Sequence, residues 1–263
     1  VYSYPADYAG PYLAAAAVLF SLYLYMNFSG CCDLAIGSAR ILGYNLLENF
    51  ESPFLAPTFR ELWRRWHMSL TGWFRRYLYV PLGGSRKGLF RHCMNLLLVF
   101  LFSGLWHGAD WGYLWWGLAS GLLSVAGLLF DKALKRPKNP QPLPLRVLQV
   151  LRTYLLFSLV FVFFACALYG SSPAVMFAGM FKGWSGALPG LASGFVAAGL
   201  DAASARVALI GAAFVFACEA LGNVSQWVRK LPFWVRWPLY YLLCLSILFF
   251  GAFGQSAYIY QQY

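Results

Sequence analysis

The 263-residue chain is 60% hydrophobic and only 11% charged, with a mean hydropathy of +0.59. Globular domains carry about 25% charged residues, so this composition excludes an ordinary water-soluble protein, and the 19% aromatic content excludes a disordered chain. The formal net charge of +11 is concentrated in loops, because seventeen of the twenty Lys and Arg lie in the stretches 60–91, 132–152 and 229–236. This distribution is typical of cytoplasmic loops, not of a nucleic-acid-binding surface. We therefore predict an all-α polytopic membrane protein, with membrane lipid and no nucleic acid among its partners.

Several apolar runs are expected to cross the bilayer, which takes about 20 residues of helix. The first is 11–37, and three more follow in the second half of the chain at 145–170, 206–222 and 238–254. The stretch 171–204 is rich in Gly, Ala and Ser and contains a single cation, Lys182. We expect that stretch on the extracytoplasmic side of the membrane.

Residues 59–77 have a helical pattern with two distinct faces. Apolar side chains recur at the helical period, and a second stripe contains Arg60, Arg64, His67, Thr71 and Arg75. The pattern predicts one amphipathic helix with a cationic face. Such a helix either lies against anionic lipid at the membrane surface or forms a cationic wall that receives an anionic substrate.

Residues 93–130 contain two apolar runs between two basic loops. The run 94–106 is about 13 residues, or roughly 20 Å of helix, whereas the hydrocarbon core is roughly 30 Å thick. Because both flanking loops are basic, we predict a re-entrant hairpin that breaks at residues 107–110 (HGAD) and returns over 111–130. This hairpin places His107 deep in the membrane, where irregular backbone must be buried in protein or line a wet cavity.

His107 is the first candidate for chemistry, since an ionisable residue inside a membrane is a functional hypothesis by default. It is either a base for a hydroxyl proton or a structural residue satisfied by a neighbour such as Asp110 or a carbonyl. Asp110 itself is either the N-cap of the returning helix or an orienting residue for His107. His92 lies in a basic loop and is expected to be a solvated bystander. No metal site is expected, because the Cys and His residues lack metal-ligand spacing.

Two long motifs resemble the membrane-bound O-acyltransferases, and in particular the bacterial branch that O-acetylates alginate and other exported polysaccharides. They are FRELWRRWHMSLTGWFRRYLYVPLGGSRKG (59–88) and NLLLVFLFSGLWHGADWGYLWWG (95–117). The segments NFSGCCDLAIG (27–37), ENFESPF (48–54) and YIYQQY (258–263) are also similar to that branch. The chain departs from the family pattern at Asn27, at Cys31-Cys32 and at Arg76. We interpret residues 1–263 as a single membrane-embedded acyltransferase domain, the C-terminal part of a longer chain, with its core motifs in 20–120.

The resemblance implies a ring of tilted transmembrane helices with re-entrant helices around a central catalytic His, which is His107. His67 is the second family histidine, and it is expected to orient the donor or stabilise developing negative charge. A cytoplasmic acyl thioester, such as acetyl-CoA or an acyl carrier, is the implied donor substrate, and no prosthetic group is implied. A periplasmic SGNH-type acetyltransferase and polysaccharide synthase or export subunits are the implied partners, in the bacterial inner membrane.

The resulting hypothesis is transfer of acetyl groups across the inner membrane for O-acetylation of an exported polysaccharide. The donor's anionic carrier is expected near Arg60, Arg64, Arg75 and Asn95. Two alternatives stay open: D-alanyl transfer to teichoic acid, and a non-catalytic channel or assembly subunit in which His107 is structural. The acceptor polymer is left open among alginate, cellulose and peptidoglycan.

Overall fold

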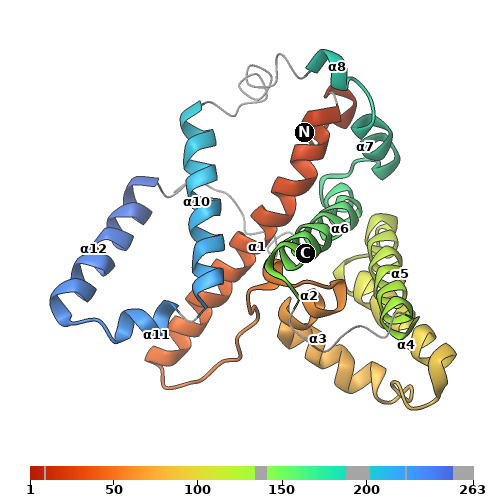
Figure 1. Ribbon diagram of the computed structural model, residues 1–263, viewed down its shortest axis with the longest axis horizontal. Coiled ribbons are helices and arrows are strands. Elements are labelled where there is room, and N and C mark those ends of the chain that lie inside the picture. Colours follow the sequence, from red (N-terminus) through yellow and green to blue (C-terminus); the bar gives the residue numbers. More distant parts are fainter. Residues whose placement is uncertain (9, 134–140, 188–201, 223, 251–263) are drawn as a thin grey trace. The chain divides into compact units, whose positions relative to one another are not determined.

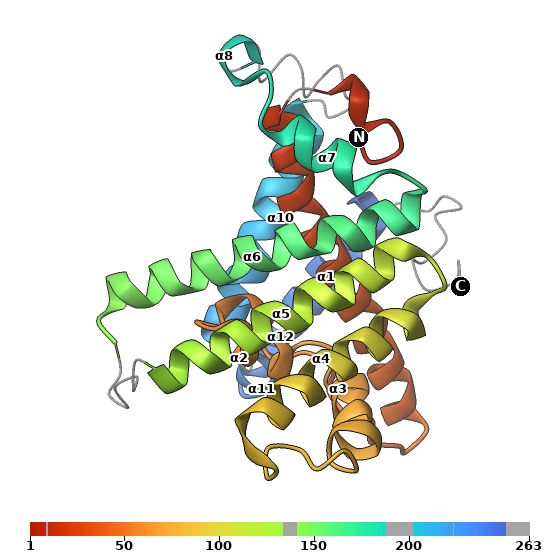
Figure 2. The same ribbon diagram turned by 90° about the vertical axis from the view of Figure 1, so that its right-hand side faces the viewer.

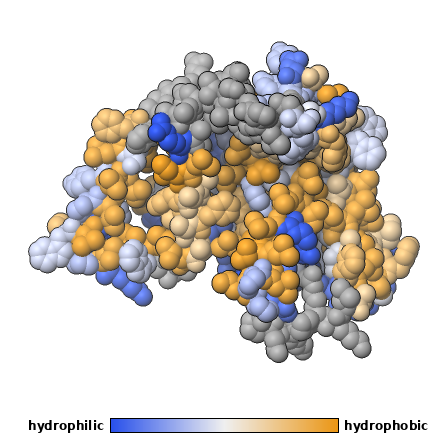
Figure 3. Space-filling model, turned by 45° about the horizontal axis from the view of Figure 1, so that its top comes forward, coloured by the Kyte–Doolittle hydropathy of each residue, from blue (hydrophilic) through white to orange (hydrophobic). Residues whose placement is uncertain are grey.

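The computed structural model describes residues 1–8, 10–133, 141–187, 202–222 and 224–250, which form helices and no β-strand (Figure 1). Four helices are long and apolar enough to cross a membrane: α1 (Gly10–Ile41), α4 (Gly88–His107), α5 (Trp111–Ala133) and α6 (Leu143–Tyr169). Hydrophobic residues cover much of the described surface in Figure 3. On α6, for example, Leu148, Leu151 and Leu155 are exposed at helical spacing, as expected of a face that meets lipid. The predicted all-α polytopic membrane protein is confirmed.

The chain divides into two compact units, residues 1–206 and residues 207–263. The second unit contains most of α10 (Ala202–Leu221), together with α11 (Val224–Arg229) and α12 (Phe233–Phe250). Of the predicted spans 206–222 and 238–254, residues 206–221 and 238–250 are helical, and 251–254 lie outside the described residues. Their apolar helices, Leu209–Leu221 and Phe233–Phe249, are shorter than the four spans of the first unit. The single domain over 1–263 stays a prediction.

In the first unit, α4 and α5 lie side by side along their lengths and are joined by residues 108–110 (Figure 2). Small residues allow this close approach. A Cβ added at Gly117 would lie 2.5 Å from the Phe100 carbonyl oxygen, and one added at Gly104 would collide with the Tyr113 carbonyl oxygen. Close backbone contact through small residues is a common way for membrane helices to associate.

The predicted length of the helix before the break is wrong. The apolar run covers only 94–106, but α4 begins at Gly88 and contains 20 residues, about 30 Å of helix and enough to cross the hydrocarbon core. The polar start of the helix, including Arg91 and His92, continues it beyond the apolar run. The break lies at 108–110, within the predicted 107–110, with His107 as the last residue of α4, while re-entry into the membrane stays a prediction.

Interhelical hydrogen bonds join α1 to α6, which pack together in the first unit. The hydroxyls of Ser21 and Ser158 lie 2.8 Å apart, and the Tyr154 hydroxyl donates to the Val18 carbonyl at 2.9 Å. Such bonds contribute roughly 0.6–2 kcal/mol each between membrane helices. After α6 the chain forms α7 (Pro173–Met180), which packs against η1 (Pro5–Asp7), and then the short α8 (Trp184–Ala187). Residues 188–201 of the predicted extracytoplasmic stretch lie outside the described residues.

The predicted single amphipathic helix over 59–77 is also wrong. The structure has η2 (Pro53–Leu55), then α2 (Phe59–Arg65), α3 (Met68–Phe74) and the π-helical segment η3 (Arg75–Tyr79). The break between α2 and α3 is stabilised by the non-helical segment 44–52, here called the strap. Glu51 N donates to the Arg65 carbonyl at 3.1 Å, and Met68 N donates to the Asn49 carbonyl at 2.9 Å. Tertiary hydrogen bonds thus replace those of a continuous helix.

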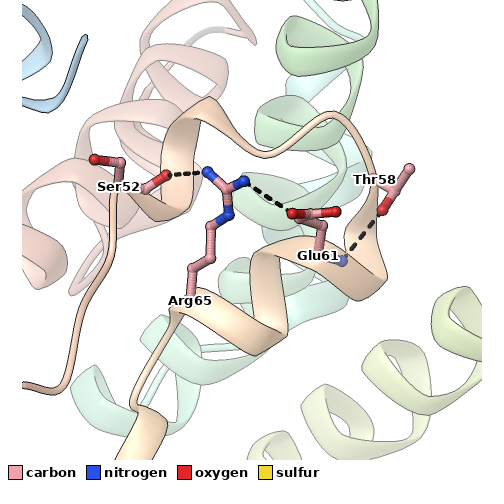
Figure 4. Close-up of polar contacts among 4 residues, drawn as sticks. All are labelled: Ser52, Thr58, Glu61 and Arg65. Carbon is pink, nitrogen blue, oxygen red and sulfur yellow. Dashed lines mark hydrogen bonds and ion pairs between the residues drawn. The ribbon is translucent and has the colours of Figure 1, made fainter. Parts of the chain in front are cut away.

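Hydrogen bonds made by side chains stabilise the start of α2 and hold this helix against the strap. Thr58 Oγ1 accepts from Glu61 N at 3.2 Å, which is the geometry of an N-cap. Arg65 donates to Glu61 Oε1 at 2.8 Å and to the Ser52 carbonyl at 3.4 Å (Figure 4). These contacts hold α2 against the strap and so position His67, which lies two residues beyond the end of α2.

Candidate active site

His107 is the last residue of α4 and is only 7% exposed. Aromatic rings surround it, with ring centroids 4.9 Å away at Trp106, 5.1 Å at Phe164, 5.2 Å at Trp116 and 6.4 Å at Tyr113. Within the part of the chain that the structure describes, neither imidazole nitrogen has a hydrogen-bond partner. The alternative in which Asp110 or a backbone carbonyl satisfies His107 is therefore not what the geometry shows.

Asp110 precedes the first residue of α5. Its Oδ1 accepts from Gly112 N at 2.7 Å, which is the contact of an N-cap residue with the second residue of its helix. The carboxylate thus caps the returning helix, as one of the two sequence interpretations expected. Its proposed role in orienting His107 stays a prediction, and it would need a contact other than this one.

His67 occupies the break between α2 and α3 in a left-handed conformation, with φ 46° and ψ 54°. That conformation is uncommon for a residue with a side chain and is often found at functional sites. Its Nδ1 is buried and has no hydrogen-bond partner among the described residues, and the edge-on Phe28 ring lies 4.7 Å away. Burial lowers the pKa of His67 to about 4, so the ring is neutral at pH 7 and offers one donor and one acceptor.

Trp106 connects the two histidines. Its indole centroid lies 6.4 Å from the His67 ring and 4.9 Å from the His107 ring, and both contacts are edge-to-face. Trp106 also lines an open pocket of about 380 Å³, together with His67, Ser69, Leu70 and Trp73. His67 is therefore accessible from this pocket, whereas His107 lies behind the indole.

The predicted donor residues belong to different elements. Arg60 on α2 forms a 2.6 Å ion pair with Asp131 on α5, and Arg64 on the same helix is exposed without an ion-pair partner in the described residues. Arg75 is exposed at the start of η3. The cations do not form one continuous helical face, because the helix breaks between Arg64 and Arg75.

Asn95 has a structural contact that the sequence did not predict. It is fully buried in α4, and its Nδ2 donates to the Leu82 carbonyl at 3.3 Å and to the Gly84 carbonyl at 2.9 Å. Asn95 thereby holds the PLGGSRKG loop against the start of α4. His92, expected to be solvated, is half-buried beside the Tyr79 ring at 5.9 Å.

Sequence reasoning missed the aromatic enclosure of His107. Trp106 in LWHG and Trp116 in LWWG lie close to His107 along the chain, so the density of Trp in this stretch could have predicted aromatic neighbours for His107. Phe164 on α6 gave no signal, because only the packing of α5 against α6 brings it to the site. The described residues contain no group of three or more His, Cys, Asp or Glu placed to hold a metal ion.

Residues 5–166 match the model of MBOAT, the membrane-bound O-acyltransferase family, and this match covers more than half of the chain. The probable alginate O-acetylase AlgI of Pseudomonas putida is 44% identical over 125 residues, covering 48% of this chain and 25% of the relative. The peptidoglycan O-acetyltransferase of Helicobacter pylori is 39% identical over 145 residues, covering 55% and 27%.

A more distant similarity is to the teichoic acid D-alanyltransferase of Bacillus subtilis, at 32% identity over 126 residues, covering 45% of this chain and 32% of the relative. The chain thus spans about a quarter to a third of the length of these relatives. The matched region contains both histidines, the broken helix 59–79 and the α4–α5 pair. The chain belongs to the membrane-bound O-acyltransferase family.

Proposed function

We propose that this protein is an O-acetyltransferase of the bacterial inner membrane, which moves acetyl groups from a cytoplasmic thioester toward an exported polysaccharide. The observation that carries the proposal is that His67 and His107 both contact the Trp106 indole. His67 lines an open pocket, whereas His107 is enclosed by aromatic rings. Family membership supports acyl transfer as the chemistry. The alginate and peptidoglycan relatives support acetyl as the group and polysaccharide as the destination.

The donor side of the proposal begins at the His67 pocket. The thioester binds there, and its anionic carrier lies near Arg64 and Arg75. Arg60 also lies on this side, but its guanidinium forms an ion pair with Asp131. Because Nδ1 of His67 is buried without a hydrogen-bond partner among the described residues, Nε2 is the nitrogen left to meet a ligand, and in the tautomer protonated there it presents an N–H. That N–H can donate to the carbonyl oxygen of the thioester and stabilise its negative charge as the reaction proceeds.

His107 supplies the proton transfer in this proposal. Its imidazole takes the proton of an attacking hydroxyl, the new C–O bond forms, the C–S bond breaks, and the departing thiolate takes the proton from the imidazolium. Positioned bases of this kind contribute about 10²–10⁴-fold to the rate. Asn95 contributes by holding the PLGGSRKG loop in place, and Asp110 by capping α5 immediately after the His107 break.

The hydroxyl that receives the acetyl group belongs to an acceptor outside the cytoplasm, with a periplasmic SGNH-type acetyltransferase and polysaccharide synthase or export subunits as partners. D-alanyl transfer to teichoic acid is the second candidate, and the Bacillus subtilis relative favours it at 32% identity. The acetyl-transferring relatives are more similar, at 39% and 44% identity, so we place acetyl transfer first.

Membranes that contain the protein provide the test. They should consume an isotopically labelled acetyl thioester and release free thiol, and membranes without the protein should not. A D-alanyl thioester should be consumed more slowly than the acetyl thioester. If neither thioester is consumed while the protein is correctly inserted, a non-catalytic channel or assembly subunit becomes the better description.

A further inference from the structure

The four rings around His107 differ sharply in their own exposure. Trp116 and Phe164 are each 2% exposed and Tyr113 is 5% exposed, whereas Trp106 is 53% exposed. The three buried rings also contact one another, with Tyr113–Phe164 at 5.0 Å and Trp116–Phe164 at 5.6 Å. Protein interiors are close-packed, so moving a buried ring displaces its neighbours. Trp106 is thus the ring around His107 that can move at the lowest cost.

Trp106 is also the ring that faces a route to His107. It lines the pocket of about 380 Å³ with His67, Ser69, Leu70 and Trp73, and His107 does not line that pocket. The indole contacts both imidazoles. A group that enters beside His67 therefore meets the Trp106 indole before it meets His107.

We propose that Trp106 is a specificity-determining residue, which separates the His67 pocket from His107 and lets only a short acyl group reach His107. This inference rests on the proposed acyl transfer. The space beside His107 is filled by an indole on one side and by buried rings on the others. An acetyl group needs a small displacement of the indole, whereas each further methylene needs additional space that the indole occupies.

The separation of the two histidines can be tested without any acyltransfer activity. Diethyl pyrocarbonate modifies accessible imidazole nitrogens, and peptide mass spectrometry reports the modification rate of each histidine in membranes that contain the protein. In the wild type, His67 should react faster than His107. Trp106→Ala should raise the His107 rate several-fold, Trp106→Phe should raise it less, and neither should raise the His67 rate as much.

Trp115→Ala is the matched control. Trp115 on α5 is 50% exposed, nearly as much as Trp106, but it lies outside the pocket lining and outside the rings around His107. This variant should leave the His107 rate at the wild-type value. Equal rates for His67 and His107 in the wild type, or a His107 rate that Trp106→Ala does not change, would overturn the proposal.

The acyl specificity is tested with acetyl and butyryl thioesters in the same membranes. One methylene in an apolar site is worth about tenfold or more in rate, so Trp106→Ala should raise the ratio of butyryl to acetyl transfer by about tenfold or more. Trp106→Phe should give a smaller rise, and Trp115→Ala none.

If the wild type uses the acetyl thioester and Trp106→Ala leaves the ratio unchanged, the role of Trp106 fails while the proposed function stands. If the wild type uses neither thioester, the proposed function fails, and the histidine modification rates alone decide whether Trp106 separates the two sites.

Discussion

The rings of His67 and His107 both contact the indole of Trp106, although the two histidines are forty positions apart in the sequence. His67 reaches Trp106 from the break between α2 and α3, and His107 reaches it from the end of α4, where the chain leaves the helix. Each histidine thus sits at a helix end, and the contact of His67 with Trp106, the residue directly before His107, brings the two ends together. The different surroundings of the two rings suggest different roles, which the following predictions separate.

The first prediction concerns acid stability. The pKa of His67 is lowered to about 4 in the folded protein from an ordinary value near 6.5, so between these values the unfolded chain binds a proton that the folded protein does not. Stability is therefore lost as the pH falls through this window, by up to about 3 kcal/mol at 1.36 kcal/mol per pKa unit. His67→Phe cannot titrate, so its thermal midpoint in detergent should fall less than that of the wild type between pH 7 and pH 4.5.

The control for this measurement is Phe28→Leu, which removes the ring next to His67 and adds no titratable group. Its thermal midpoint should be lower than that of the wild type at every pH, with the acid-dependent loss retained. Identical pH dependence in the wild type and in His67→Phe would show that the burial of this imidazole does not control acid stability.

The second prediction separates Arg64 from Arg60, which lie one turn apart on α2. Arg64→Gln should raise the KM for the thioester most at low salt, because exposed charge interactions are screened within about 8–10 Å at physiological ionic strength. Arg60→Gln should raise the KM less, since Arg60 already pairs with Asp131, and should lower the thermal midpoint slightly. An exposed ion pair contributes only about 0.2–1 kcal/mol. Equal KM changes in the two variants would remove the distinction between donor contact and structural pair.

The third prediction concerns the packing of α4 against α5. Gly117→Ala should lower the thermal midpoint in detergent, because the added methyl would lie 2.5 Å from the Phe100 carbonyl oxygen and the two backbones would have to separate. Overpacking of this kind costs about 1–3 kcal/mol. Gly127→Ala, on the same helix but with open space around the added methyl, should be neutral or stabilise by up to about 1 kcal/mol. The same shift in both variants would contradict the close approach at Gly117.

Much of the architecture could be predicted from the sequence because it depends on composition over long windows. The helices α1 and α6 follow from the apolar runs 11–37 and 145–170, and the break before Asp110 follows from the HGAD interruption. The sequence predicted α4 and α5 only as the two arms of a re-entrant hairpin, not as helices long enough to cross the membrane. The start of α4 at Gly88 could not be found this way, because the apolar run begins only at residue 94 and a helix continues through polar residues that lie at its end.

The break at His67 was hidden for a different reason. The apolar period of 59–77 continues through Trp66 and Leu70, so the local pattern favours an uninterrupted helix. The contacts that stabilise the break come from the backbone of Asn49 and Glu51, more than ten residues earlier in the chain. The Arg60–Asp131 pair depends in the same way on tertiary contact between α2 and α5, and no local pattern indicates it.

The most direct test of the proposed chemistry replaces His107 by glutamine. Glutamine keeps a comparable size and hydrogen-bonding capacity but cannot take up a proton near pH 7. If His107 is the base, His107→Gln should insert normally and lose about 10²–10⁴-fold of the acetyl-transfer rate, and His67→Gln should lose less. The measurement is the rate of labelled acetyl transfer from the thioester in membranes containing equal amounts of each protein. A His107→Gln protein that inserts normally and retains near wild-type transfer would contradict general-base catalysis at His107.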